Sequence, residues 1–205
     1  MSIDTRARAS ALLRGLAEAA PERVSLGGLA TALKERGIGM AVLCLALPNA
    51  LPGPTLPGFS ALLALPIVWL GLQMARGRNY PQFPRWLRER SVGRRRFVGL
   101  VARATPLLDR LERWFGPRPG WLTRGPGRRL PGFALILYGF VLALPIPFGN
   151  LPIAVAITVL ALGLIERDSR ALISGLVFGA LACLWNALLI GVGFAAAARL
   201  LLYVR

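Results

Sequence analysis

The sequence predicts an all-α integral membrane protein built from two internal repeats of proline-broken, re-entrant-type helical hairpins, with a C-terminal membrane helix and amphipathic surface helices. Its 205 residues are 55% hydrophobic, with a mean hydropathy of +0.58, which is too apolar for an ordinary soluble domain. Charged residues are almost excluded from three stretches, 38–75, 131–165 and 171–198, which are the expected membrane segments. Two of these stretches are interrupted by proline-rich turns of nearly identical sequence.

The two interruptions define the repeats. Residues 45–54 read LALPNALPGP and residues 142–152 read LALPIPFGNLP, and each is followed by a Leu-Gly-Leu motif and by arginines. Because proline lacks a backbone donor and clashes with the preceding turn, neither stretch can form one straight membrane helix. We expect two half-length helices around an irregular turn in each repeat. Irregular backbone is tolerated at membrane depth only beside protein or water, so the repeated break predicts a binding or passage site.

The first two segments follow from apolar patterning and flanking charge. Residues 1–37 are expected to form amphipathic helices on the cytoplasmic membrane surface, because residues 5–20 place alanine and leucine on one helical face. A soluble helical pair packed on the linker is the alternative. Residues 38–75 form the first broken hairpin, and basic residues on both sides of it put both ends in the cytoplasm. Each half is shorter than the roughly 20 apolar residues of a full span, which favours the re-entrant form.

Residues 76–129 are a basic linker that carries 15 arginines and three acidic residues. An arginine excess of this kind keeps a membrane loop in the cytoplasm. Anionic lipid headgroups are the expected counter-charge, each basic residue near the surface contributing roughly 1 kcal/mol. The apolar bulk of the chain disfavours nucleic acid as a partner. We expect interfacial helices in the linker and a lipid- or partner-binding cluster at Arg94, Arg95 and Arg96.

The C-terminal half repeats the plan and adds one segment. Residues 130–165 form the second broken hairpin, again flanked by arginines. Residues 166–205 form either one tilted membrane helix or, with a break near Asn186, a third hairpin. Gly175, Gly179 and Cys183 recur every four residues and present a small-residue face for close helix packing. We expect that face to serve the core of the protein itself rather than a dimer.

The candidate binding site lies at the two turns. An amide in a low-dielectric setting is costly unless paired, and it can both donate and accept, so Asn49 and Asn150 suit an ion, a sugar hydroxyl or a lipid headgroup. The alternative is turn chemistry alone, because asparagine tolerates left-handed backbone. The remaining candidate lining residues are two prolines and three hydroxyl side chains: Pro52, Pro152, Thr55, Ser60 and Thr158. Hydroxyls in membrane helices commonly bond to their own backbone instead.

Polar residues where the hairpins end form a second group. These candidate gate residues are Gln73, Arg76, Glu166, Arg167 and Asp168. A salt bridge among the charged ones would suit a gate, although most such clusters are solvated helix ends.

The residue inventory excludes several kinds of chemistry. There is no histidine, so His-based catalytic triads, His-ligated metals and His-ligated haem are excluded. The two cysteines lie in apolar runs without metal-type spacing and are expected to be small buried side chains. Paired carboxylates or an activated nucleophile are not visible in the membrane segments. We therefore expect no catalytic residues, no metal and no cofactor, and the protein is not expected to be an enzyme.

The chain resembles the ExoD family of bacterial membrane proteins from about Leu16 onward. The resemblance depends on the order of motifs along the chain: Leu47-Pro48-Asn49, Leu51-Pro52-Gly53-Pro54, Gln73 with Gly77, Trp114 to Trp121 with Pro117-Arg118, Leu144-Pro145-Ile146-Pro147, Asn150-Leu151-Pro152 and Arg167-Asp168. Ser169 departs from the pattern, because family members often carry glycine there. The resemblance implies an inner-membrane location and a part in exopolysaccharide synthesis or export, without an assigned reaction.

The function that these observations favour is passage of a small ion or polar solute through the inner membrane at the two repeated turns. The alternative is a non-transporting accessory subunit whose arginine-rich linker binds polysaccharide-synthesis machinery or anionic lipid. An enzyme acting on lipid-linked sugars ranks third for lack of an acid and a base. A homodimer is expected, because short hairpins shield their polar turns poorly from lipid. The sequence leaves open whether the repeats are inverted or enter from one side.

Overall fold

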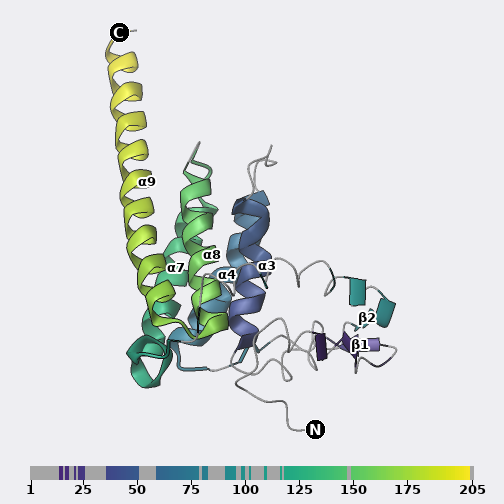
Figure 1. Cartoon of the computed structure of the whole chain (residues 1–205). Coiled ribbons are helices and arrows are strands. Elements are labelled where there is room, and N and C mark those ends of the chain that lie inside the picture. The colour runs from purple at the N-terminus through teal and green to yellow at the C-terminus, as the bar shows by residue number, and fades with distance from the viewer. Residues whose placement is uncertain are drawn as a thin grey trace.

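The computed structural model describes most of the helical core and parts of the linker. The described residues are 14–15, 17–18, 21, 23–25, 36–50, 59–78, 80–82, 91–95, 98–99, 102, 109, 116, 118–146 and 149–203. The long helices among them are α3 (Gly37–Ala50), α4 (Phe59–Ala75), α7 (Arg129–Ala143), α8 (Asn150–Glu166) and α9 (Ser169–Tyr203) (Figure 1). The short elements are β1 (Arg23–Ser25), β2 (Ser91–Gly93) and the 3₁₀ turns η2 (Trp121–Thr123) and η3 (Gly125–Arg128). The predicted all-α class is therefore confirmed in its coarse form.

The helices form two hairpins that pack against each other crosswise. α4 packs most extensively against α7, and α3 against α8, so the first helix of each hairpin meets the second helix of the other. A Cβ atom at Gly39, near the start of α3, would touch Ala161, Leu164 and Ile165, near the end of α8. A Cβ atom at Gly71, near the end of α4, would touch the start of α7. Both hairpins therefore run in the same direction within the bundle.

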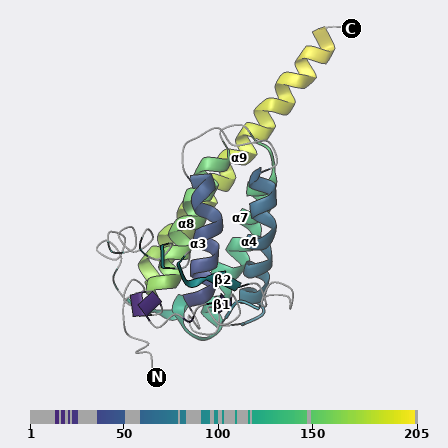
Figure 2. The same cartoon turned by 90° about the vertical axis from the view of Figure 1, so that its right-hand side faces the viewer.

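This arrangement gives the bundle two distinct ends. At one end, which we call the base, α3 and α7 begin and α4 and α8 finish. At the other, the turn end, α3 and α7 finish and α4 and α8 begin. Figures 1 and 2 show α9 rising from the base beside α7 and α8 and continuing well past the turn end.

The second helix break falls where proline predicts it, whereas the first helix continues past its proline. α7 finishes at Ala143 and the following Leu144 is extended, immediately before Pro145. α3 instead continues through Pro48 to Ala50. Pro48 lacks the N–H that would bond to the carbonyl of residue 44, so α3 gives up one backbone hydrogen bond near its end and still completes its last turn. Asn49 therefore lies in the last helical turn rather than in the connection, and residues 51–58 lie outside the described part of the chain.

The second helix of each hairpin finishes in the same way at the base. Gly77 has φ 81° after α4, and the backbone N–H of Arg78 donates to the carbonyl of Gln73 at 3.0 Å. Arg167 has φ 54° after α8, and the N–H of Asp168 donates to the carbonyl of Gly163 at 3.0 Å. A left-handed residue followed by this wide bond is a common helix ending. After α8, this ending turns the chain sharply into α9 at the base.

α9 is one continuous helix, so the break considered near Asn186 does not occur. Its first half packs on the second hairpin through small residues, because a Cβ atom at Gly175 would overlap Leu160 and one at Gly179 would overlap Tyr138. The Tyr138 hydroxyl also donates to the Leu176 carbonyl at 2.8 Å. The prediction that this small-residue face serves the core of the protein is confirmed.

The bundle is apolar outside as well as inside. Its buried core includes Leu70, Leu135, Leu142, Ile153, Ile157, Leu160 and Ile165. Its outer surface carries large exposed apolar side chains at helical spacing: Leu62, Leu65 and Trp69 on α4, Phe133, Leu137 and Phe140 on α7, and Val177, Leu181, Leu184 and Leu188 on α9. Of the described helices, one has a segment, Ser169–Ala195, that is long and apolar enough to cross a membrane by length and composition, whereas three shorter apolar helices fall below that length.

The outer surface also corrects one expectation. Cys44 on α3 is exposed rather than buried, whereas Cys183 on α9 is half-buried against the core. Because these helices are apolar on every side, their sequence pattern does not separate the face toward the core from the face away from it.

A short β-ribbon connects the N-terminal region with the linker. β1 pairs antiparallel with β2 in the register Arg23 with Gly93 and Ser25 with Ser91. Arg14 also forms a salt bridge with Asp109, with both side chains largely exposed. No strand was predicted for residues 23–25 or 91–93, which lie in the segments 1–37 and 76–129. Three-residue strands carry too little pattern for a sequence to reveal them.

Candidate functional site

The turn end of the bundle holds buried amides. Asn49, in the last turn of α3, is 4% exposed. Its Oδ1 accepts a hydrogen bond of 2.7 Å from Ser60 Oγ on α4, so the two side chains join the helices on either side of the first turn. The Nδ2 atom of Asn49 is buried without a partner among the described residues. A buried amide that is only half paired costs free energy, which marks it as a candidate for ligand contact.

The second turn brings two more amides together. Asn150 is the first residue of α8, and its Oδ1 is buried without a partner among the described residues. Asn186 of α9 is 2% exposed, and its Nδ2 donates to the carbonyls of Gly149 at 3.1 Å and Ala182 at 2.8 Å. A Cβ atom at Gly149 would overlap the Asn186 amide, so only glycine allows this contact. Asn186 thus fixes α9 to the turn that Asn150 follows.

Asn186 is the site residue that sequence reasoning missed. A signal existed, because it is the single amide side chain within the apolar run 171–198, and a polar side chain in such a run marks a function or a partner. We considered it only as a possible break.

The other predicted lining residues divide into three groups. Ser60 reaches the site through Asn49. Thr158 donates to the Ala154 carbonyl of its own helix at 2.8 Å, which is the ordinary behaviour of a hydroxyl in an apolar helix. Pro152 is half-buried in the first turn of α8, while Pro52 and Thr55 lie outside the described residues. The structure therefore brings Ser60 to the amides and turns the Thr158 hydroxyl toward its own backbone.

The candidate gate residues lie at the base, at the opposite end from the amides. Gln73 is buried, and both functions of its amide bond to the backbone of Gln82, with Nε2 to the carbonyl at 3.0 Å and Oε1 from the N–H at 2.7 Å. Asp168 is 1% exposed, and its Oδ1 accepts the N–H of Arg170 at 2.9 Å, which caps the start of α9. Gln73 and Asp168 thus have local structural bonds, and a gate remains a prediction.

The remaining three residues of that group differ in exposure. Arg76 is exposed in the turn after α4, Glu166 is buried at the end of α8, and Arg167 is half-buried in its left-handed position. All three therefore lie where a hairpin meets the linker.

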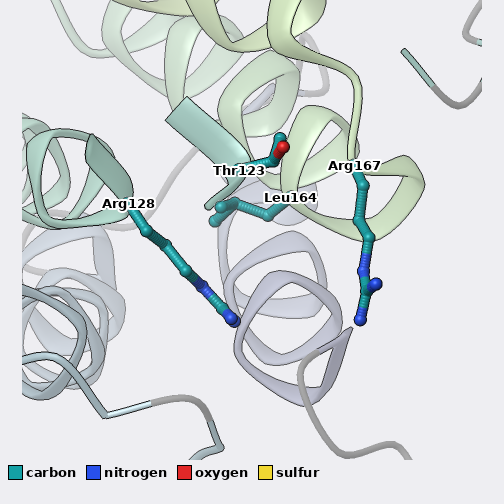
Figure 3. A pocket seen from close by; sticks show the side chains of 4 residues that line it. All are labelled: Thr123, Arg128, Leu164 and Arg167. Atoms are coloured by element: carbon teal, nitrogen blue, oxygen red, sulfur yellow. The ribbon is translucent and has the colours of Figure 1, made fainter. Parts of the chain in front are cut away.

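A small basic pocket lies beside these residues. It is lined by Thr123, Arg128, Leu164 and Arg167 and has a volume of about 10 Å³, comparable to the room that one water molecule needs. Figure 3 shows the two arginine side chains extending the same way on either side of Leu164. The base is thus positively charged, whereas the described helices at the turn end carry no charged side chain.

The predicted lipid- or partner-binding cluster follows the β-ribbon. Arg94 and Arg95 are exposed, and Arg94 Nη2 lies 3.5 Å from the carbonyl of Glu18, while Arg96 lies outside the described residues. No group of three or more histidine, cysteine, aspartate or glutamate side chains that could hold a metal occurs among the residues that the structure describes.

Comparison with known proteins places this fold in a family. The family model described as "Exopolysaccharide synthesis, ExoD" matches residues 9–188. The chain is 28% identical over 159 residues to Protein ExoD of Rhizobium meliloti, covering 76% of this chain and 65% of that protein. It is also 29% identical over 159 residues to an uncharacterized protein of Synechocystis, covering 77% of this chain and 74% of that protein. No solved structure matches the chain.

The family match covers most of the chain, from the N-terminal region to the middle of α9, and so includes both hairpins, the linker and all three amides. The chain therefore belongs to the ExoD family, whose description names exopolysaccharide synthesis, and it spans slightly less than two thirds of the length of Protein ExoD.

Proposed function

We propose that this chain is a multi-pass inner-membrane protein of exopolysaccharide synthesis or export that passes a small ion or polar solute at a site formed by its two broken-helix turns. The observation that carries the proposal is the pair of buried amide atoms at the turn end that lack a partner among the described residues, Asn49 Nδ2 from one hairpin and Asn150 Oδ1 from the other. Unpaired amide groups inside an apolar bundle are unfavourable for stability alone. A site that must bind and release a polar ligand accounts for them.

The outer surface supports membrane insertion of the hairpins. Contiguous exposed apolar side chains on α4, α7 and α9 would be unfavourable in water and are favourable against lipid tails. Exposed arginines gather at the base, including Arg76, Arg124, Arg129 and Arg170. An arginine-rich end stays on the cytoplasmic side, so the hairpins would enter from the cytoplasm.

Helix lengths set the depth of the site. At 1.5 Å per residue, the 14 residues of α3 span about 21 Å and the 17 residues of α8 about 26 Å. The hydrocarbon core is about 30 Å thick. With the base at the cytoplasmic surface, the turns would lie within the membrane, beyond its middle but short of its far side, whereas α9 would cross completely. This supports the re-entrant form for both hairpins.

The common orientation of the hairpins favours a gated pore over inverted-repeat alternating access. The two hairpins are related by an approximate two-fold axis that runs along the helices, because α3 meets α8 as α7 meets α4. Repeats related in this way enter from one side of the membrane, whereas inverted repeats are related by an axis in the membrane plane. The two turns would therefore meet at one depth around a shared path.

Flux measurements in proteoliposomes test this proposal. We expect the purified protein to increase permeability to ions or small polar solutes, and Asn49→Ala or Asn150→Ala to abolish the increase. Ser174→Ala is the matched control, because this hydroxyl bonds to the Ala171 carbonyl on the outer face of α9, near the base. Absence of any flux in wild-type liposomes contradicts the proposal.

A non-transporting accessory role is the second candidate. The exposed Arg94 and Arg95 follow β2 in the linker, at a distance along the chain from both turns. These side chains could hold anionic lipid or polysaccharide-synthesis machinery. Simultaneous alanine substitution of Arg94, Arg95 and Arg96 should then abolish partner pull-down or vesicle binding. Such a loss, together with absent flux, would favour this candidate.

A homodimer completes the proposal. The half of α9 beyond the bundle exposes Ile190, Val192 and Phe194, and a second copy packed there would cover these side chains and help to shield the second turn from lipid. Chemical crosslinking in native membranes should yield a dimer, and exclusively monomeric protein would contradict it.

A further inference from the structure

We propose that Asn186 of α9 completes the site at the hairpin turns, and that this site takes a neutral, hydroxyl-bearing solute rather than an ion. The inference rests on the proposed function and specifies the class of solute that the site would bind. Water and small polyols are the candidate solutes, because each carries a hydroxyl group that both donates and accepts hydrogen bonds.

The orientation of the Asn186 amide is fixed by its partners. Its Nδ2 donates to two backbone carbonyls, those of Gly149 and Ala182, at 3.1 and 2.8 Å. Carbonyl oxygens only accept, so the side chain cannot be turned without losing both bonds. Its Oδ1 is consequently an acceptor, and it is buried without a partner among the described residues. Asn150, the residue after Gly149, adds a second buried and unpartnered Oδ1.

Asn49 lies at the same depth on the opposite side of the α3–α8 interface. Gly39 is level with residues 161–165 of α8, and Asn49 follows Gly39 by ten residues, about 15 Å along the axis. Because α3 and α8 run antiparallel, the same distance along α8 leads to about its first turn, where Asn150 lies. The bond to Ser60 on α4 directs the Asn49 side chain into the bundle.

The amides together offer both kinds of hydrogen-bonding group. Asn150 and Asn186 supply acceptors, and Asn49 supplies the unpaired Nδ2 donor. A hydroxyl satisfies a donor and an acceptor at once. A cation would be attracted by the two oxygens and repelled by the Nδ2 group, and an anion would be repelled by the two oxygens.

The surroundings disfavour a charged ligand further. No described residue of α3 or α4 is charged, the first charged side chain of α8 is Glu166 at the base, and the α9 sequence from Ala171 to Ala198 has no Asp, Glu, Lys or Arg. An ion here would lose its hydration with no counter-charge nearby, a cost that a neutral hydroxyl compound avoids.

The test compares neutral and ionic flux in the same proteoliposomes. Stopped-flow light scattering measures osmotic water permeability and glycerol permeability, and a potential-sensitive dye measures potassium and chloride flux. We expect water or glycerol permeability above that of empty liposomes, without ion flux. Asn186→Leu should lower it by about tenfold, the factor that corresponds to about 1.4 kcal/mol. Gly149→Ala, which leaves every amide in place but pushes against Asn186, should lower it as well.

Controls separate the possible outcomes. Ser174→Ala should leave permeability unchanged, and size-exclusion profiles establish that each variant folds. If Asn186→Leu does not fold, Asn150→Leu at the half-buried end of α8 replaces it. Water flux without glycerol flux identifies water as the solute.

Three results would overturn the inference. Ion flux that these substitutions remove, with no neutral flux, refutes the ligand class while passage through the turns stands. Neutral flux that Asn186→Leu leaves intact refutes the role of Asn186 alone. Absence of all flux refutes the proposed function and this inference together.

Discussion

The reactivity of Cys44 gives a direct test of membrane insertion. This thiol is exposed on α3, and the second cysteine of the chain, Cys183, is half-buried on α9. Replacing Cys183 with serine leaves Cys44 as the single thiol. It follows Gly37 by seven residues, so it lies about 10 Å from the base along the helix axis. With the base at the membrane surface, Cys44 would face lipid tails rather than water.

The expected rate follows from the chemistry of the thiol. The thiolate is the nucleophile that reacts with a maleimide, and placing a charged group within a bilayer costs at least about 2.5–3.5 kcal/mol. Each 1.4 kcal/mol is a factor of ten. A membrane-impermeant maleimide should therefore label Cys44 about 100-fold more slowly than a thiol at the exposed base.

The assay follows labelling in inside-out membrane vesicles by gel shift. The reference is Arg76→Cys in a chain with both native cysteines replaced by serine, because Arg76 is exposed where α4 meets the linker. Labelling in denaturing detergent gives the total thiol in each sample. Equal rates for Cys44 and the Arg76→Cys thiol in intact vesicles would refute membrane insertion of the first hairpin, and with it the site within the membrane.

Three further predictions concern stability and local order. Gly132→Ala should destabilise the protein by about 1–3 kcal/mol, because its Cβ would lie 2.6 Å from a backbone nitrogen of α4. A thermal melt measures this, with Gly191→Ala as a control that should not destabilise the protein, since nothing lies within 4 Å of that Cβ and alanine favours the helix more than glycine does. Gln73→Leu should increase proteolysis near Gln82 by removing both hydrogen bonds to it, and an unchanged digestion pattern would contradict this. Asp168→Ala should cost about 1 kcal/mol through loss of the α9 cap, and Asp168→Asn should retain most of the stability in the same melt.

The proline pattern predicted much of the fold. Because Pro145 removes a donor in the middle of an apolar run, the break after Ala143 follows from local chemistry. The same reasoning placed Asn49 in the connection between the two helices of the first hairpin, whereas Asn49 lies in the last turn of α3. A proline predicts that a helix breaks or kinks nearby, but α4 continues through Pro66, so where a helix finishes also depends on its packing.

The relative orientation of the hairpins could not be predicted. It depends on close backbone contacts between residues distant in sequence, such as Gly71 with Gly132. A glycine in an apolar run predicts that another helix can approach closely, without identifying that helix. Flanking arginines favoured entry from one side, and the glycine contacts establish that both hairpins share one orientation.

The two Leu-Gly-Leu motifs show how similar sequences acquire different contacts. Gly71 on α4 packs against α7 of the other hairpin, whereas Gly163 on α8 packs against Leu172 at the start of α9. The glycine of the first motif therefore packs against the other hairpin, whereas the glycine of the second packs against the C-terminal helix α9.

The hydrogen bonds at the two turns differ in the same way as the glycine contacts do. The first turn bonds within its own hairpin, from Ser60 to Asn49, whereas the second bonds to α9 through Asn186 and Gly149. Because the second turn depends on α9 and the first does not, a shift of α9 along its axis would move Asn150 relative to Asn49.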